Sequence, residues 1–142
     1  MTEVFVEVAL PPELVEVATA TKGFLPDDEA DALRAVVAAH LRPGGVAVEI
    51  GTYCGKSAIH LGHVAQEAGA TLLTLDHHRG SEEQQPGWEY HDTELVDPEI
   101  GAMDTLPFAR RALHRAGLEE VVVPVVGRST TVSAFWIAVF RR

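Results

Sequence analysis

Residues 50–57, which read IGTYCGKS, form the stretch of the chain best suited to bind a ligand. They come close to a phosphate-binding loop, G-x-x-x-x-G-K-[ST], but only three residues separate Gly51 from Gly55, so the loop is one residue short. The dinucleotide pattern G-x-G-x-x-G fits no better, because its second and third glycines would fall at Tyr53 and Lys56. The loop therefore disfavours both kinds of phosphate-bearing ligand.

Glu49 indicates a different ligand, because it places a carboxylate at the end of an apolar run just before the glycine-rich turn. A carboxylate there repels a polyphosphate and attracts a cation. S-adenosylmethionine carries an ammonium and a sulfonium and no phosphate. Gly51 would let the backbone pass close to such a ligand, and Gly55 would allow a tight entry into a helix. Asp76 ends the next apolar run, where its carboxylate can accept hydrogen bonds from both hydroxyls of a ribose.

The elements that must position these residues alternate between helix-like and strand-like patterns, which predicts an α/β fold with a parallel sheet. Apolar runs predict three strands, at residues 46–50, 71–75 and 121–126. Helical spacing predicts helices at residues 13–21, 28–41, 57–68 and 105–116, and a helix start at 130–136. Right-handed crossovers place the second strand between the first and the third. Ligands bind at the carboxyl ends of such strands, so residues 49–57, 76–77 and 127–130 should meet at one edge.

Side chains at the helix starts and on one helix face give further expectations. Asp27 or Asp28 can cap the helix at 28–41, and Asp104 can cap the helix at 105–116. His60, His63 and Glu67 share one face of the helix at 57–68, with a spacing that could bind a metal. We interpret these three residues as a solvent-facing polar stripe instead.

A long polar stretch at residues 77–103 is too long for an ordinary connection, so it is either a functional loop or partly disordered. Trp88 and Tyr90 within it could form a lid over a cofactor or substrate, or belong to a plain surface loop. His77, His78 and His91 show no tight two-ligand spacing, so no metal site is predicted there.

Composition narrows the class of protein. The 142 residues fit a single domain, and the formal net charge of -10 argues against a nucleic-acid partner. Cys54 is the one cysteine, which excludes an internal disulfide, favours a reducing cytoplasm and suits a packing role. No run of residues is apolar and long enough to span a membrane.

Three stretches together resemble a known family. The stretch VEIGTYCGKSAIHLG resembles the glycine-rich motif of class I S-adenosylmethionine-dependent methyltransferases, and most closely that of the catechol O-methyltransferase-like branch. TLLTLDHH looks like that family's second strand with its acidic ribose ligand, and VVVPVVGRST looks like its third strand and adenine-side turn. The resemblance covers roughly residues 27–136 and implies a Rossmann-like sheet with S-adenosylmethionine as cofactor.

The resemblance implies a role for each motif residue. In the glycine-rich loop, Glu49 and Gly51 would line the methionine and sulfonium end of the cofactor. Tyr53 and Ser57 would flank its carboxylate, with Gly55 turning the chain into the helix, whose N-terminus favours anions.

Beyond that loop, the resemblance implies that Asp76 binds the ribose and that His77 lies beside the adenosine. Arg128 and Ser129 would approach the adenine. No catalytic residue follows from the resemblance.

The expected domain is incomplete. The family's fourth strand usually ends in an acidic turn, which in the metal-dependent branch supplies a divalent-ion ligand, whereas this chain ends in IAVFRR. The resemblance thus implies a single partial domain over residues 1–142, with residues 1–25 as an N-terminal extension and metal ligands absent from this chain. The sheet should have about three strands in the order 3-2-1, with a short fourth strand at the C-terminus left open. We interpret the chain as the cofactor-binding half of a methyltransferase, truncated or encoded by an interrupted reading frame.

The function implied is methylation of a small molecule, most simply on oxygen, by an enzyme of which this chain alone would be inactive. A non-catalytic remnant or interaction module is the alternative, and a nicotinamide-dependent oxidoreductase a weaker one. Neither a nucleic acid nor a membrane is expected as a partner. An exposed sheet edge would favour a homo-oligomer.

Overall fold

A three-stranded parallel sheet forms the centre of the molecule, in a computed structural model that describes the backbone of residues 8–140 and the side chains of residues 8–136. Its strands are β1 (Val46–Ile50), β2 (Thr71–Asp76) and β5 (Val122–Val126), in the order β1-β2-β5. Both pairings are parallel, and Val48, Leu73 and Val123 lie in one row across the sheet. The predicted α/β fold and the central place of the second strand are confirmed; the third strand is numbered β5 because two short strands precede it.

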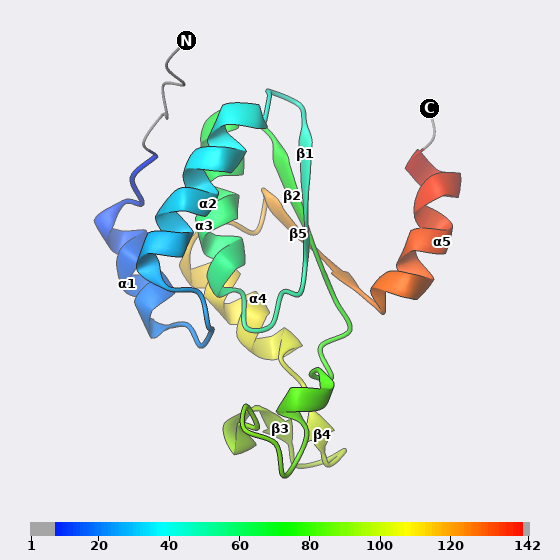
Figure 1. Cartoon of the computed structure of the whole chain (residues 1–142). Helices are drawn as coiled ribbons and strands as arrows, with labels where there is room; N and C mark the ends of the chain where they lie inside the picture. Colours follow the sequence, from blue (N-terminus) through cyan, green and yellow to red (C-terminus); the bar gives the residue numbers. More distant parts are fainter. Residues whose placement is uncertain (1–7, 141–142) are drawn as a thin grey trace.

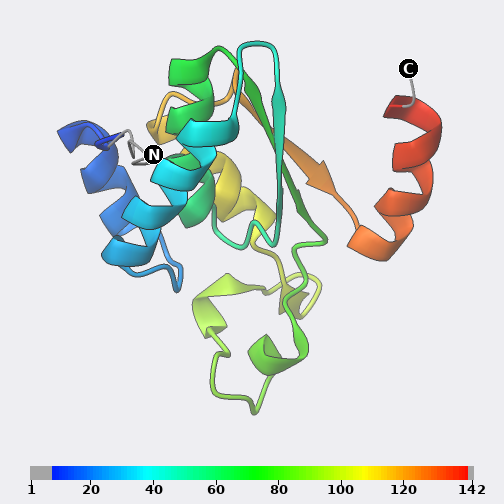
Figure 2. The ribbon, with the colours of Figure 1, turned by 45° about the horizontal axis from the view of Figure 1, so that its top comes forward.

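Helices cover one face of this sheet, as Figure 1 shows. They are α1 (Pro12–Ala20), α2 (Asp27–His40), α3 (Lys56–Ala68) and α4 (Leu106–Arg115). The fifth, α5 (Ser129–Phe140), follows β5 and stands on the opposite side of the sheet, which a second view confirms (Figure 2).

The short fourth strand left open at the C-terminus is not observed in the described residues. Residues 137–140 continue α5 instead, and Arg141 and Arg142 lie outside the described residues. The physical reason is that neither glycine nor proline interrupts the chain after Gly127, so the helix that starts at Ser129 runs on.

The helix starts differ from expectation at both places, because neither expected aspartate occupies the N-cap position. Pro26 occupies the N-cap of α2, so Asp27 and Asp28 are already helical and neither side chain caps the helix. Their carboxylates instead lie in the first turn, where the helix dipole favours negative charge. In α4 the N-cap is Thr105, and the carboxylate of Asp104 accepts a hydrogen bond from the backbone N–H of Leu106 at 3.2 Å.

The main core lies between the sheet and α3, and it corrects the expected polar stripe. His60 and His63 are buried, with only 6% and 7% of their surface exposed, and Glu67 alone faces solvent. Packing of α3 against the sheet alone would leave a single exposed face. In the structure α1 and α2 also pack against α3, so the side facing away from the sheet is covered as well.

The long connection between β2 and α4 is folded. It contains two short 3₁₀ helices, η1 (Glu82–Gln84) and η2 (Thr93–Leu95), and an antiparallel pair, β3 (Val96–Asp97) and β4 (Ala102–Met103). Leu95 and Met103 are buried against Cys54 in a second small core. The disordered alternative for this segment is therefore wrong. Figure 1 places the segment at the end of the molecule toward which β2 runs.

β1 forms one edge of the sheet, because within the described residues it pairs only with β2. Its alternate side chains Val46, Val48 and Ile50 are exposed by 56%, 48% and 70%. Within residues 8–140, no helix combines the length and apolar character needed to cross a membrane.

Candidate functional site at the carboxyl ends of the strands

The carboxyl ends of β1, β2 and β5 open into one cavity of about 360 Å³, within the usual range for small-molecule sites. The cavity is lined by Ile50, Gly51, Tyr53, Leu75, Asp76, His77, Gly80, Ser81, Gln84, Thr105, Gly127 and Ser129. The predicted meeting of the three segments at one edge is thus confirmed. None of these lining residues is a lysine or arginine, so the cavity offers no fixed cation for a polyphosphate.

Asp76 connects the end of β2 to the glycine-rich loop. Its Oδ2 accepts a hydrogen bond from the backbone N–H of Tyr53 at 2.8 Å, and its Oδ1 accepts one from the backbone N–H of His78 at 2.9 Å. Each carboxylate oxygen can accept a second bond. Asp76 can therefore hold the loop and still present oxygen atoms to a ligand in the cavity.

The glycine-rich loop makes its turn at two left-handed glycines. Gly51 has φ of 99° and Gly55 has φ of 94°, a region that side-chain-bearing residues rarely adopt. A Cβ atom on Gly51 would meet no atom within 4 Å, so the backbone there is open to a ligand. Tyr53 also has a positive φ, 50°, and its N–H is the one bound by Asp76.

Glu49 lies in β1, just before the loop, and is not among the residues that line the cavity. Its Oε1 accepts a hydrogen bond from the Ser57 hydroxyl, and its Oε2 accepts one from the Thr74 hydroxyl at 2.5 Å. Thr74 in turn contacts the Thr52 hydroxyl at 2.6 Å. Burial raises the pKa of Glu49, and the bonds from Ser57 and Thr74 oppose that rise. The carboxylate therefore fastens the end of β1 to the start of α3.

The remaining predicted residues fall into two groups. His77 and Ser129 line the cavity, whereas Gly55, Ser57 and Arg128 do not line it. Gly55 and Ser57 form the turn into α3 behind the loop. Cys54 is buried, and burial raises the pKa of its thiol to about 12, in keeping with a packing role.

Thr105 and Gln84 line the cavity although sequence reasoning did not single them out. The Thr105 hydroxyl lies 2.7 Å from Nδ1 of His78, a buried residue with φ of 61°. Nε2 of His78 has no hydrogen-bond partner among the described residues, and burial lowers the pKa of this imidazole. In the sequence, only the position of Thr105 at the start of a predicted helix could have indicated that it lies at the site.

Residues 22–25 were also missed, and they close against the glycine-rich loop. They share a cavity of about 280 Å³ with Gly51, Tyr53 and Ser57. A Cβ atom on Gly23 would lie 2.8 Å from Cβ of Lys56, so the two segments touch closely. The glycine was visible in the sequence, but its close neighbour was not.

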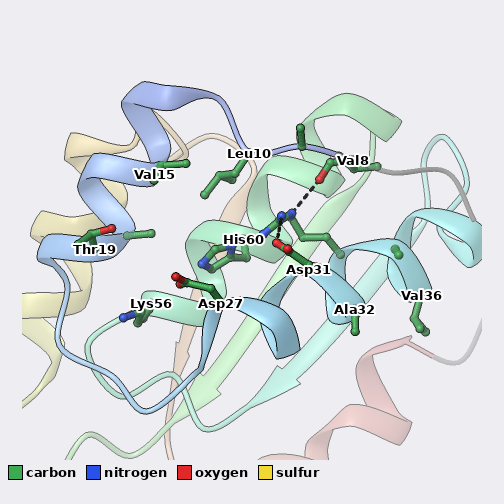
Figure 3. A pocket seen from close by; sticks show the side chains of 14 residues that line it. Val8, Leu10, Val15, Thr19, Asp27, Asp31, Ala32, Val36, Lys56 and His60 are labelled. Atoms are coloured by element: carbon green, nitrogen blue, oxygen red, sulfur yellow. Dashed lines mark hydrogen bonds and ion pairs between the residues drawn. The ribbon is translucent and has the colours of Figure 1, made fainter.

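Another cavity, of about 790 Å³, lies away from the strand ends, between α1, α2 and the start of α3. Figure 3 shows His60, Asp31 and Val8 among the residues that line it. Arg34 is buried there and contacts Nδ1 of His60 at 2.7 Å, the Val8 carbonyl oxygen at 2.8 Å and Asp31 at 2.5 Å. Because arginine only donates, Nδ1 of His60 accepts. This network ties α2 to α3.

No group of three or more His, Cys, Asp or Glu side chains suited to a metal ion occurs within the part of the chain that the structure describes.

A family model described as a methyltransferase domain matches residues 48–139. The chain belongs to this methyltransferase domain family. The matched residues include every candidate site residue named from the sequence, from Glu49 to Ser129. The predicted resemblance is thereby confirmed at the level of the family.

Solved structures of O-methyltransferases share the fold of this methyltransferase domain. One is the O-methyltransferase TomG from Streptomyces achromogenes, which is involved in tomaymycin synthesis and was solved with S-adenosylmethionine. It is 18% identical to this chain, with a TM-score of 0.55, and the match covers 94% of this chain and 49% of TomG. An O-methyltransferase from Bacillus cereus, solved with S-adenosylhomocysteine, is 20% identical, with a TM-score of 0.57. The match covers 96% of this chain and 52% of the Bacillus cereus protein. A putative O-methyltransferase from Klebsiella pneumoniae is 19% identical, with a TM-score of 0.55. The match covers 95% of this chain and 50% of the Klebsiella pneumoniae protein. The chain spans about half the length of these proteins.

Proposed function

We propose that this methyltransferase domain binds S-adenosylmethionine in the strand-end cavity and serves methylation of a small molecule on oxygen. The observation that carries the proposal is Asp76, held at the end of β2 beside the open backbone of Gly51, in a cavity without lysine or arginine. That chemistry suits a ribose and a positively charged sulfonium better than a pyrophosphate. The proteins from Streptomyces achromogenes and Bacillus cereus, solved with this cofactor or its demethylated product, support it.

The roles proposed for the loop residues follow their positions. The backbone at Gly51 and Tyr53 would contact the methionine end. Ser57, in the first turn of α3, lies where free backbone N–H groups attract a carboxylate. Glu49 would act through Ser57 as a positioning residue, and its charge would favour the cofactor's ammonium.

On the adenosine side, Asp76 would accept hydrogen bonds from the ribose hydroxyls, while His77 and Ser129 would border the base. Arg128 lies next to Ser129 but outside the cavity lining, so its role rests on the family resemblance alone.

S-adenosylmethionine supplies an electrophilic methyl group attached to a sulfonium. The contribution of this chain to such a transfer is to hold donor and acceptor in line, since positioning accounts for much of the barrier lowering in reactions of this type. The similarity to the O-methyltransferases from Streptomyces achromogenes and Klebsiella pneumoniae supports a small-molecule acceptor.

We propose further that residues 1–142 act as one partial domain, with residues 1–25 as an N-terminal extension. Leu14 and Ala18 of α1 support this, because they are buried in the main core. A free, buried Cys54 is in keeping with a reducing cytoplasm. Self-association would use the free edge of β1.

A parallel titration tests the cofactor assignment. S-adenosylhomocysteine, NAD and ATP would be titrated into the 142-residue chain by isothermal calorimetry. We expect S-adenosylhomocysteine to bind at micromolar concentration and the two phosphate-bearing ligands to bind at least about tenfold more weakly, a difference of about 1.4 kcal/mol. Equal or stronger binding of NAD would overturn the proposal in favour of an oxidoreductase.

A further inference from the structure

Three aromatic rings from distant parts of the chain meet beside the glycine-rich loop. The ring centroid of Phe24 lies 5.4 Å from that of Tyr53 and 5.3 Å from that of Tyr90. Phe24 belongs to the turn before α2, Tyr53 to the glycine-rich loop and Tyr90 to the long segment between β2 and α4. Phe24 and Tyr90 nevertheless remain 62% and 44% exposed. The three rings thus form an aromatic wall that a ligand can reach.

This wall borders a cavity of about 440 Å³, called the aromatic cavity below. The charged side chains that line it are negative on balance. Glu89 and Asp92 line it, and Lys22 is its one lysine. The Lys22 ammonium lies 2.5 Å from Asp92 and 2.6 Å from Glu94, so two carboxylates surround a single positive charge. Residues 77–104, which supply five of the nine lining residues, carry eight carboxylates and one arginine. An anionic ligand would therefore meet repulsion here.

Tyr53 connects this cavity to the proposed cofactor site, because it lines both the aromatic cavity and the strand-end cavity. Phe24 and Tyr53 also line the small cavity next to Gly51 and Ser57. A ligand against the aromatic wall would therefore lie next to the cofactor, where a methyl acceptor has to be.

We propose that this cavity is a binding site for an organic cation, and that the methyl acceptor carries an ammonium group which the aromatic wall and Glu89 hold. Aromatic faces attract cations through their negative ring potential, and nearby carboxylates add to that attraction. The binding site itself stands on the geometry; its assignment to the methyl acceptor rests on the proposed function.

Three phenols of similar size and different charge test the proposal. Tyramine is cationic, N-acetyltyramine is neutral and 4-hydroxyphenylpropionate is anionic. Each would be titrated into the chain by calorimetry, with and without saturating S-adenosylhomocysteine. We expect tyramine to bind at least about fivefold more tightly than the neutral compound, and the anion to bind most weakly. Equal affinities of tyramine and the propionate, or no binding of tyramine up to millimolar concentration, would overturn the proposal.

Matched variants test whether tyramine binding depends on the aromatic wall itself or on any exposed ring of the same segment. Tyr90→Ala should weaken tyramine binding about fivefold, and Tyr90→Phe should retain it within about twofold, because the attraction needs the ring and not the hydroxyl. Trp88→Ala removes an exposed ring of the same segment that lines neither cavity and should have no effect. Unchanged tyramine affinity in Tyr90→Ala would contradict the inference.

The two proposals fail in distinguishable ways. If S-adenosylhomocysteine binds but tyramine shows no preference over the anion, the cation site is wrong and the proposed function stands. If tyramine shows the expected order while S-adenosylhomocysteine does not bind, the cation site stands and the proposed function is wrong.

Discussion

Asp76 has two tasks at the scale of single residues, since it accepts backbone hydrogen bonds from Tyr53 and His78 and borders the strand-end cavity. Its removal should therefore affect the loop and the ligand together. This distinguishes it from Glu49, whose hydrogen bonds go to side chains below the loop.

We expect Asp76→Ala to weaken S-adenosylhomocysteine binding by more than about 1.5 kcal/mol, the range for hydrogen bonds to a charged group. Calorimetry at neutral pH measures the change. Asp28→Ala provides the matched control, because Asp28 lies in α2 and lines none of the cavities described above. An Asp76→Ala affinity equal to that of the control would show that another residue binds the ribose.

His60 should make stability depend on pH. Burial, together with the charges of Arg34 and Lys56, lowers the pKa of His60 from 6.5 to about 4, while Asp27 and Asp31 act in the opposite direction. Between these two pKa values the unfolded chain binds a proton that the folded chain does not. Stability from neutral His60 is therefore present above about pH 6.5 and is lost as the pH falls toward 4.

We expect the free energy of unfolding to fall by about 2 kcal/mol more between pH 7 and pH 5 in the wild type than in His60→Gln. Glutamine keeps an acceptor for Arg34 and does not titrate. Urea unfolding at the two pH values provides the measurement, and parallel losses in both proteins would contradict the assignment.

At the scale of elements, the segment between β2 and α4 is held by two buried apolar residues and by polar bonds to other segments. Leu95 and Met103 are 1% and 4% exposed, and Lys22 bonds to Asp92 across the chain. The segment therefore forms a fixed part of the candidate site, bordering both the strand-end cavity and the aromatic cavity.

Leu95→Ala should lower the free energy of unfolding by about 2–4 kcal/mol, because it removes a fully buried leucine. It should also speed proteolysis within residues 82–92. Ile100→Ala, in the same segment but 53% exposed, should change stability by less than about 0.5 kcal/mol. Denaturant unfolding and timed protease digestion test both variants; equal effects would show that Leu95 does not anchor the segment.

At the scale of the whole molecule, the sheet is covered by four helices on one face and shows apolar side chains on the other. Val48 and Val123, neighbours of Leu73 in one row, are 48% and 43% exposed. Such a surface beside a free strand edge favours association between chains.

We expect the 142-residue chain to associate with rising concentration in light scattering, and Val48→Lys to reduce that association by placing a charge on the exposed face of β1. Val36→Lys, at a similarly exposed position on α2, is the matched control and should associate like the wild type. A wild-type chain that stays monomeric at all concentrations would disprove self-association through β1.

The sequence by itself determined the strands of the main sheet, the helices that follow them and the edge at which the site forms. Apolar runs bounded by glycines predicted β1 with its observed bounds, and right-handed crossovers placed β2 between its neighbours. Glu49, Gly51 and Asp76 could be singled out because a carboxylate or glycine at a strand end departs from the surrounding apolar pattern.

Only the tertiary structure decided which distant residues touch. His60 was predicted to face solvent, but it is buried because α2 brings Arg34 onto it. The meeting of Phe24 with Tyr90 and the bond from Lys22 to Asp92 depend on how the turn before α2 and the long segment between β2 and α4 fold toward each other. Local patterns report the period and the ends of an element, whereas such contacts depend on the relative placement of several elements, which no local pattern contains.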